Sequence, residues 1–427
     1  MTALILFGLF TLLLFLSVPI AIGLGLASTA ALLFSGKVSS SYVAQGLVTS
    51  IDSFPLMAVP FFILAGNLMS HGGLSERLLS VGKILFGRFN GGMAVIAVVT
   101  CMFFGAISGS GPATVAAVGA ILLPAMTKGG YRPAFSTGLI ASAGSLGIVI
   151  PPSIPMIIYA SSANVSVTEL FLAGIIPGLL IGFFLITYAW FVGKRESVGL
   201  KEPTPTLGEA VKTIYDAKWA LLVPIIILGG IYGGVFTPTE AAAVAVFYGL
   251  IVGVFLYKEL SLKKLYIILA DSALITSTIM IIVGAATIFG RVLTIERIPV
   301  QLADYTLEIV SNPLLLLLLI NLLLLVIGTF METLAAIIIL TPILLPIAAG
   351  IGVHPVHFGI IMIVNLAIGM ITPPVGVNLF VASRVASLSL EKVMRSAVPF
   401  VIVMLIALLL ITYLPVISLG LSNLINH

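Results

Sequence analysis

Apolar segments follow one another along almost the whole chain, and this succession leaves few folds open. Of the 427 residues, 60% are hydrophobic and only 8% are charged, whereas about 25% of the residues of soluble domains are charged. A helical membrane span needs ~20 apolar residues. Backbone groups inside a bilayer must be hydrogen-bonded within the protein, which favours helices. The sequence therefore predicts an all-α polytopic protein embedded in a lipid bilayer, and it excludes a soluble globular protein.

Several apolar segments are interrupted by proline, glycine or hydroxyl-bearing residues and are too short to span a bilayer alone. Helical runs of ~13 to 16 residues reach ~20 to 24 Å, against ~30 Å of hydrocarbon. We expect two pairs of short helices to form re-entrant hairpins, at 92–127 and 313–349. Two further crossings, 135–165 and 357–387, are expected to be broken helices because each contains a Pro-Pro pair.

The positive charges test this arrangement of crossings and hairpins. Sixteen of the 19 Lys and Arg residues fall on one side of the membrane, and only Lys37, Arg291 and Arg297 fall on the other. Cytoplasmic loops of membrane proteins carry the excess of basic residues. Both termini are therefore predicted to face outward, and the hairpins are predicted to open on opposite sides. The net charge of +4 is too small to indicate nucleic acid as a partner.

The second half of the chain repeats the first at a constant offset of 222 residues. At this offset prolines and glycines coincide, namely Gly130 with Gly352, Pro133 with Pro355, Gly147 with Gly369, Pro151-Pro152 with Pro373-Pro374, and Pro177 with Pro399. The two copies begin on opposite sides of the membrane in the arrangement above. Such inverted-topology repeats are typical of secondary transporters, whose binding sites lie where helices are broken.

Hydroxyl groups gather where the helices are expected to break. They belong to Ser108, Ser110, Ser145, Ser153, Thr329, Thr333 and Thr372. Hydroxyls and unpaired carbonyls are oxygen ligands for a hard cation such as Na⁺, and half-helix N-termini favour a carboxylate. The alternative for any single hydroxyl is a hydrogen bond to the preceding turn of its own helix. As a set, they indicate a cation-coupled carrier of an organic anion.

Two other polar residues lie at the expected breaks. Glu332 is the only acidic residue in a predicted hairpin tip, and Asn378 follows the second Pro-Pro pair. An ionisable group inside a membrane is a functional candidate. The alternatives are that the Glu332 carboxylate reaches water and that the Asn378 amide satisfies the broken helix.

The sequence offers little for catalysis or metal chemistry. It has four histidines and one cysteine, with no cluster at metal-ligand spacing, so we expect no enzyme, no transition metal and no organic cofactor. His354 and His357 are expected in a loop at the outer surface. Glu240, which follows Thr237, is expected to be an acidic residue at a helix N-terminus after an N-cap threonine.

Four motifs together resemble the large membrane subunit of tripartite ATP-independent periplasmic (TRAP) transporters. They are FGAISGSGPAT (104–114), GIVIPPS (147–153), FTPTEAAA (236–243) and GMITPPVG (369–376). The resemblance covers nearly the whole chain and implies an elevator-type ion-transporter fold. It also implies Na⁺ as the coupling ion, a small membrane (Q-type) subunit, and a soluble periplasmic (P-type) binding protein that delivers the substrate.

The resemblance also suggests which residues form the sites. One Na⁺ site is implied at Ser108 and Ser110 with backbone groups around Gly147, Val149 and Pro151. The second Na⁺ site is implied at Gly328, Thr329, Met370 and Thr372. The substrate is expected between these sites, near Ser110, Ser153, Glu332 and Asn378. The motifs look most similar to those of sialic acid transporters; the alternatives are a C4-dicarboxylate TRAP subunit and a stand-alone Na⁺/carboxylate symporter of the same broad fold.

In this family each repeat contributes to a fixed scaffold and to a moving transport domain. The implied scaffold parts are 1–91 and 219–312, and the implied transport-domain parts are 92–165 and 313–387. The remaining ranges are a connecting span (166–192), a cytoplasmic linker (193–218) and a C-terminal span (388–427). The protein is then expected in the bacterial inner membrane, crossing it many times, with both termini in the periplasm.

Overall fold

The computed structural model describes residues 1–37, 40–87, 91–195, 206–310 and 312–425, and within them every regular element is a helix. Residues 196–205 of the predicted cytoplasmic linker lie outside the described residues, as do Arg88 and Lys201 of the predicted basic side. The described ends of that linker are helical, because one helix runs to Arg195 and the next begins at Leu207. Thr206 and Glu209 cap that next helix reciprocally.

The helices divide into two series. The first series is α1 (Thr2–Phe15), α2 (Ile20–Ser35), α3 (Ser40–Thr49), η1 (Pro55–Met57), α4 (Ala58–His71), α5 (Leu74–Phe86), α6 (Gly92–Ser108), α7 (Gly111–Lys128), α8 (Pro133–Gly144), η2 (Ser145–Ile148), α9 (Ile154–Ala163) and α10 (Val167–Arg195). The second is α11 (Leu207–Tyr232), α12 (Pro238–Ile251), η3 (Val252–Leu256), α13 (Leu262–Ile295), α14 (Ile298–Ile309), α15 (Pro313–Phe330), α16 (Thr333–Gly350), α17 (Pro355–Gly369), α18 (Val377–Ala386), α19 (Leu390–Tyr413) and α20 (Val416–Ile425).

The offset of 222 residues that relates the two halves of the sequence also relates their helices. Helices α7 and α16 coincide at both ends, and α5, α6, α9 and α10 have counterparts in α14, α15, α18 and α19. One pair differs: α13 is a single helix of 34 residues where the first half has α3, η1 and α4. The structural repeat therefore extends well beyond the matching prolines and glycines.

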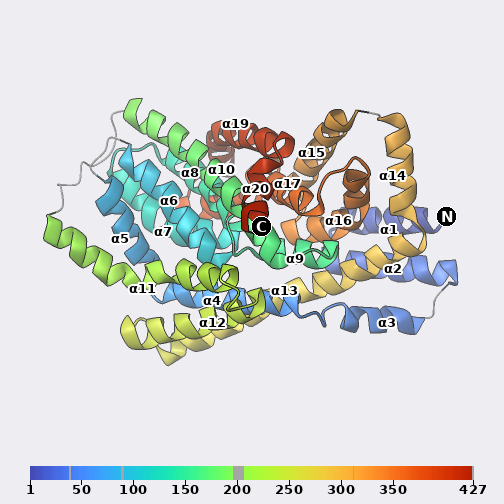
Figure 1. The fold of residues 1–427 in the computed structure, drawn as a ribbon, viewed down its shortest axis with the longest axis horizontal. Helices are drawn as coiled ribbons and strands as arrows, with labels where there is room; N and C mark the ends of the chain where they lie inside the picture. Colours follow the sequence, from blue (N-terminus) through green and yellow to red (C-terminus); the bar gives the residue numbers. More distant parts are fainter. Residues whose placement is uncertain (38–39, 88–90, 196–205, 311, 426–427) are drawn as a thin grey trace.

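Figure 1 shows how the helices group in space. Helices α6–α10 and α15–α20 form an upper group, α2–α4 with α11–α13 form the lower edge, and α1 packs against α2 just above that edge. Helix α13 runs along this edge and packs against α2, α3 and α4, and also against α16 of the upper group. At the two ends of the view, α5 packs against α6 and α14 packs against α16.

The two hairpins are tight because residues at each tip cap the second helix. Hairpin 1 consists of α6 and α7, and Gly109 between them adopts a left-handed φ of 60°. The Ser110 hydroxyl then accepts a hydrogen bond from the backbone N–H of Ala113. Hairpin 2 consists of α15 and α16, with Glu332 as the cap. The arms have 17 to 18 residues.

Each Pro-Pro pair lies in a stretch without α-helical structure. Break 1 spans 145–153, between the end of α8 and the start of α9, and Ser153 caps α9. Break 2 spans 370–376, between α17 and α18. The second half of each broken helix packs on the hairpin of the other repeat, since α18 contacts α7 and α9 contacts α16. The repeats are therefore interlocked at their breaks.

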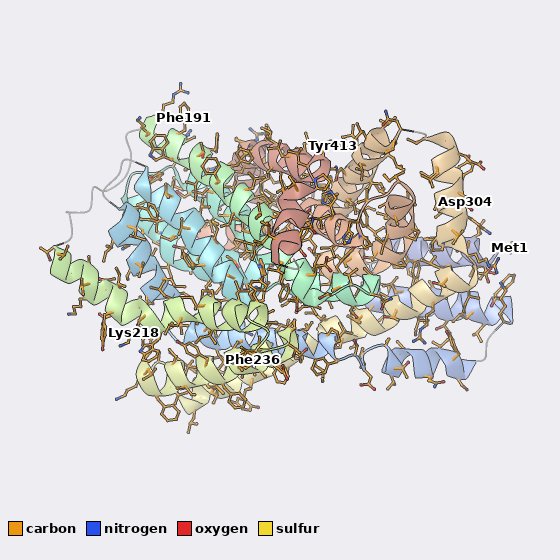
Figure 2. The ribbon with its side chains drawn as sticks, in the orientation of Figure 1. Met1, Phe191, Lys218, Phe236, Asp304 and Tyr413 are labelled. Atoms are coloured by element: carbon orange, nitrogen blue, oxygen red, sulfur yellow. The ribbon has the colours of Figure 1, made fainter. Side chains whose placement is uncertain are left out.

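The surface agrees with a multi-pass membrane protein. Among the described residues, eight helices are long and apolar enough to cross a membrane, or nine if α4 with η1 and the bent α5 count as one span. Apolar side chains project outward along α11 to α13, the edge on which Lys218 and Phe236 are labelled in Figure 2. Exposed apolar side chains on α13 include Tyr266, Leu274 and Ile281.

Candidate functional site

The tip of hairpin 1 lies directly against break 1, because glycines allow the two backbones to meet. A Cβ placed on Gly105 would lie 2.7 Å from the Cα of Gly147. A Cβ placed on Gly147 would in turn lie 2.8 Å from the carbonyl oxygen of Ser110. Only glycine fits such an approach. The contact is completed by the backbone N–H of Ile154, which donates to the Gly109 carbonyl at 3.4 Å.

A compact cluster of oxygen atoms occupies this contact. The Ser108 hydroxyl lies 3.0 Å from the Thr114 hydroxyl and 3.3 Å from the Ser110 carbonyl oxygen. Thr114 donates to that same carbonyl at 2.7 Å. Ser108 and Thr114 are buried, and Ser110 is half-buried. The structure therefore brings together Ser108, Ser110 and Gly147 of the first predicted ion site, and it adds Thr114.

Val149 and Pro151, the two remaining residues of the first predicted ion site, are buried residues of break 1. Val149 is fully buried, and its carbonyl oxygen would lie 3.0 Å from a Cβ on Gly174 of α10. Pro151 is buried as the first proline of the break. Their role in ion binding stays a prediction.

The tip of hairpin 2 meets break 2 in the same way. A Cβ placed on Gly328 would lie 3.3 Å from the Cα of Gly369. The backbone N–H of Gly376 donates to the Thr329 carbonyl at 3.4 Å, as Ile154 does to Gly109 in the other repeat. The two donors, Ile154 and Gly376, are equivalent at the 222-residue offset, whereas the acceptors Gly109 and Thr329 are not.

The second predicted ion site has a different set of oxygen atoms. The Thr329 hydroxyl donates to the Val326 carbonyl at 2.8 Å within α15, and the Thr372 hydroxyl, in break 2, donates to the Ile368 carbonyl at 2.7 Å. A hydroxyl that donates in this way keeps its lone pairs available to a cation. The Met370 carbonyl accepts from the backbone N–H of Asn378 at 3.0 Å. The structure therefore places Gly328, Thr329, Met370 and Thr372 around break 2.

A cavity of about 610 Å³ lies where the two groups of helices face each other. Its walls come from α4 and α13 of the lower edge, from both hairpin tips, and from both breaks. Ser110 and Glu332, two of the four predicted substrate residues, line it. Most of the wall is apolar, with a few polar groups, as is usual for sites that bind small molecules.

Glu332 and Ser110 occupy equivalent positions in the two repeats and have the same local task. The Glu332 carboxylate accepts hydrogen bonds from the backbone N–H groups of Leu334 and Ala335, at 2.9 and 3.1 Å. It thereby caps α16, as Ser110 caps α7. Negative charge at a helix N-terminus is stabilised by the helix dipole. The carboxylate thus supports the hairpin while facing the cavity.

The other two predicted substrate residues lie behind the cavity wall. Ser153 is fully buried and donates to the Ile148 carbonyl at 2.6 Å. Asn378 is also fully buried, and its amide donates to the Ala141 carbonyl at 3.2 Å. The Asn378 side-chain oxygen has no hydrogen-bond partner within the described residues and lies close to Gly111. Asn378 thus joins α18 to α8 beside the start of α7, and substrate contact by either residue stays a prediction.

Four polar residues of the cavity were missed by reasoning from the sequence. They are Asn67, Ser70, His71 and Thr278, which belong to α4 and α13. The Asn67 amide donates to the Ser272 hydroxyl at 2.8 Å and so joins these two helices. The first three residues follow helical spacing along one face of α4. This row of polar residues on one face of an otherwise apolar segment is the sequence feature that could have indicated a cavity wall.

No group of three or more His, Cys, Asp or Glu side chains that could hold a metal ion occurs among the residues described. His357 is buried and not in an outer loop, because its ring bonds to the Ser418 hydroxyl at 2.6 Å and faces the Thr412 carbonyl. The segment that holds both histidines is therefore the start of the buried helix α17, with His354 as its N-cap. Glu240 caps α12 together with Thr237, as predicted.

Two interlocked helical repeats, with a cavity between their hairpin tips and a second group of helices, define a membrane transport protein of the carrier type. The family profile described as the DctM component of the tripartite ATP-independent periplasmic transporter matches residues 7–417. The chain belongs to this family. It is accordingly a subunit of a transporter and not an enzyme.

Individual relatives cover most of the chain. It is 52% identical over 413 residues to the isethionate TRAP transporter permease protein DctMQ of Oleidesulfovibrio alaskensis, covering 97% of this chain and 65% of that protein. It is 44% identical over 400 residues to the C4-dicarboxylate large permease DctM of Pseudomonas aeruginosa, covering 94% and 93%. It is 39% identical over 412 residues to the sialic acid large permease SiaM of Vibrio cholerae, covering 96% of each.

A solved structure shares the fold. The crystal structure of the YdaH transporter of Alcanivorax borkumensis superposes with a TM-score of 0.63, covering 89% of each chain at 16% sequence identity. At this level of identity the likeness concerns the arrangement of helices alone.

Proposed function

We propose that this protein is the large subunit of a secondary active transporter that couples Na⁺ entry to the uptake of a small organic acid across the bacterial inner membrane. The observation that carries the proposal is the oxygen cluster at the tip of hairpin 1, beside a cavity large enough for a small molecule. Hydroxyl and carbonyl oxygens are the ligands that Na⁺ takes at broken helices of transporters.

The proposed coupling between Na⁺ and substrate follows from the adjacent positions of their binding sites. Ser110 contributes its carbonyl oxygen to the cluster and also lines the cavity. An Na⁺ ion bound there places positive charge at the end of the cavity where the acid group of a substrate would lie. At an effective dielectric constant of ~20, opposite charges ~4 Å apart attract by about 4 kcal/mol. Each would therefore raise the affinity for the other.

The transported acid is proposed to be small and anionic, a carboxylate or a sulfonate. Relatives named for isethionate and C4-dicarboxylates are more similar to this chain than the sialic acid relative is, at 52 and 44% against 39% identity. Isethionate and succinate are therefore the first compounds to test, and sialic acid, which the motifs suggested, is the third.

Transport is proposed to proceed by an elevator movement. Helices α6–α9 and α15–α18, which carry the two ion regions, would move together against α1–α4 and α11–α13. The cavity lies between these two groups, so such a movement would expose it to alternate sides. A small Q-type membrane subunit and a P-type periplasmic binding protein are proposed as partners, consistent with membership of the family.

The decisive experiment is uptake of labelled isethionate, succinate and sialic acid into proteoliposomes that contain the large and small subunits. Each acid is tested with and without an inward Na⁺ gradient and with and without the binding protein. We expect uptake of one acid only when both are present. Uptake that ignores the binding protein would support a stand-alone symporter of the same fold, and uptake that ignores Na⁺ would contradict the ion assignment.

A further inference from the structure

A second cavity of about 530 Å³ lies further along α13. The first cavity borders residues 274–282 of that helix, and the second borders residues 283–295. One wall of the second cavity comes from α3 and α13, and the facing wall comes from α9 and α16. It therefore spans the same two groups of helices as the first cavity, nearer the end of α13 that carries Arg291.

Arg291 is the only cationic side chain among the lining residues. Its guanidinium lies 5.6 Å from the centre of the Tyr42 ring, and its Nη1 would lie 3.2 Å from a Cβ on Gly46. The side chain is thus held against α3. Within the described residues, no carboxylate forms an ion pair with Arg291. The cavity therefore contains a fixed, half-buried positive charge without an internal counter-ion.

The facing wall supplies hydrogen-bond donors. Ser161 and Ser162 on α9 are half-buried, and their hydroxyls have no hydrogen-bond partner in the part of the chain that the structure describes. Asn164, just beyond α9, also lines the cavity with its amide unpaired among those residues. A guanidinium and several free donors, without a carboxylate among them, match the needs of an anionic oxygen group.

We propose that this cavity is a second anion site, which holds the acid group of the substrate before it enters the cavity at the hairpin tips. The inference rests on the proposed function, because it takes the same carboxylate or sulfonate. Arg291 lies at the end of α13 opposite Lys263 and Lys264, and the excess of basic residues on their side makes the Arg291 side the outer one. The anionic headgroup of a lipid has the same chemistry and must be distinguished by experiment.

The site has a built-in link to the transport movement. Arg291 belongs to α13, whereas Ser161 and Ser162 belong to α9, in the group of helices proposed to move. Movement of α9 past α13 would separate Ser161 and Ser162 from Arg291, and the anion site would no longer exist. An acid group held there would thus be released as the cavity changes sides.

The test is Arg291→Gln, with Arg297→Gln as the matched control, in proteoliposomes that contain both membrane subunits and the binding protein. Labelled isethionate is the probe, or succinate if wild type takes up only that acid. We expect kcat/KM for uptake to fall at least about tenfold in Arg291→Gln, the scale of one lost charged hydrogen bond. Na⁺ dependence and docking of the binding protein should stay at wild-type values in both variants.

Charge rescue separates an electrostatic role from a structural one. In Arg291→Cys, a methanethiosulfonate reagent that attaches an ethylammonium group should restore uptake, whereas reagents that attach an ethylsulfonate or a methyl group should not. The only native cysteine, Cys101, is buried, so wild type should resist all three reagents. Equal effects of the three reagents on the variant, or lost docking of the binding protein in Arg291→Gln, would overturn the proposal.

One comparison shows whether the site binds substrate or lipid. A second comparison shows whether a negative result contradicts this site or the proposed function. If Arg291→Gln loses uptake in liposomes of phosphatidylcholine alone, the site serves the substrate. If the loss requires phosphatidylglycerol, the site holds a lipid headgroup and the substrate assignment is wrong. Wild-type uptake with an unchanged Arg291→Gln variant would refute this site alone, whereas absent wild-type uptake would refute the proposed function.

Discussion

At the scale of single residues, the repeats share the glycines that allow close approach and differ in the polar groups at the hairpin tips. Gly147 and Gly369 both meet a hairpin tip without a side chain between them. By contrast, Ser108 corresponds to Phe330 at the 222-residue offset, and Ser110 corresponds to Glu332. The two proposed ion sites therefore have different oxygen ligands, and equal affinities for Na⁺ are not expected.

Ser108→Ala is predicted to weaken Na⁺ coupling. The substitution removes one oxygen from the cluster with Ser110 and Thr114, and one lost ligand interaction of about 1 kcal/mol corresponds to about a fivefold change in affinity. We expect the Na⁺ concentration for half-maximal uptake to rise about fivefold, as measured by initial rates in proteoliposomes. The control is Ser142→Ala, which removes a buried hydroxyl bonded within its own helix. Equal Na⁺ dependence in the two variants would refute the cluster as an ion site.

Residue-level reasoning from the sequence succeeded where the partner is near in the chain and failed where it is distant. Ser108 and Ser110 stand in one motif, so their proximity could be predicted. Asn378 contacts Ala141 of the other repeat, and nothing local to either residue indicates that contact. The polar residues of α4 face the cavity only because α4 packs beside α6 and α13, which depends on the whole fold.

At the scale of helices, the positions of the hairpins and breaks could be predicted because proline and glycine act locally. Prolines remove backbone donors and disfavour helical geometry in the preceding residue, so both Pro-Pro pairs interrupt helices as expected. The start of the second arm of each hairpin is set by a capping group, Ser110 for α7 and Glu332 for α16.

The cap of α16 gives a prediction at this scale. Glu332→Ala should lower the stability of the protein by about 1 kcal/mol, because two backbone N–H groups lose their acceptor. Glu332→Asp should retain most of the stability, since aspartate is itself a good cap. Thermal unfolding of the purified protein in detergent measures the difference. The neighbouring substitution Met331→Ala is the control, and similar losses in all three variants would exclude the capping role.

At the scale of the whole molecule, the two repeats together form a cavity between two groups of helices, and few segments of the chain connect these groups. The prolines and glycines predicted the repeat, and the offset then proved to hold for most helices. The exception is α13, which is continuous where its counterpart is divided at residues 50–54. The sequence carries a signal for this difference, because Pro55 begins η1 whereas α13 contains no proline.

A disulfide across the two groups is predicted to stop transport. A Cβ on Gly290 of α13 would lie 3.8 Å from the Pro342 side chain of α16, so Gly290→Cys with Pro342→Cys can be oxidised together. We expect uptake to fall to background after oxidation and to recover after reduction. The control joins α2 to α13 through Gly25→Cys and Ala285→Cys, which lie 4.0 Å apart within one group. Undiminished uptake through the oxidised first pair would contradict the elevator movement.

The Glu332 cap has an electrical consequence for the complete transport cycle. Glu332 caps α16, one of the helices proposed to move, so its negative charge would travel with that helix when neither ion nor substrate is bound. The return step carries this charge from the negative cytoplasmic side toward the outside. A membrane potential contributes ~2.3 kcal/mol per elementary charge for each 100 mV crossed in full. For Glu332 alone, the resting potential would therefore favour return to the outward-open position, whereas Lys128 on α7 and Arg384 on α18 would contribute with the opposite sign.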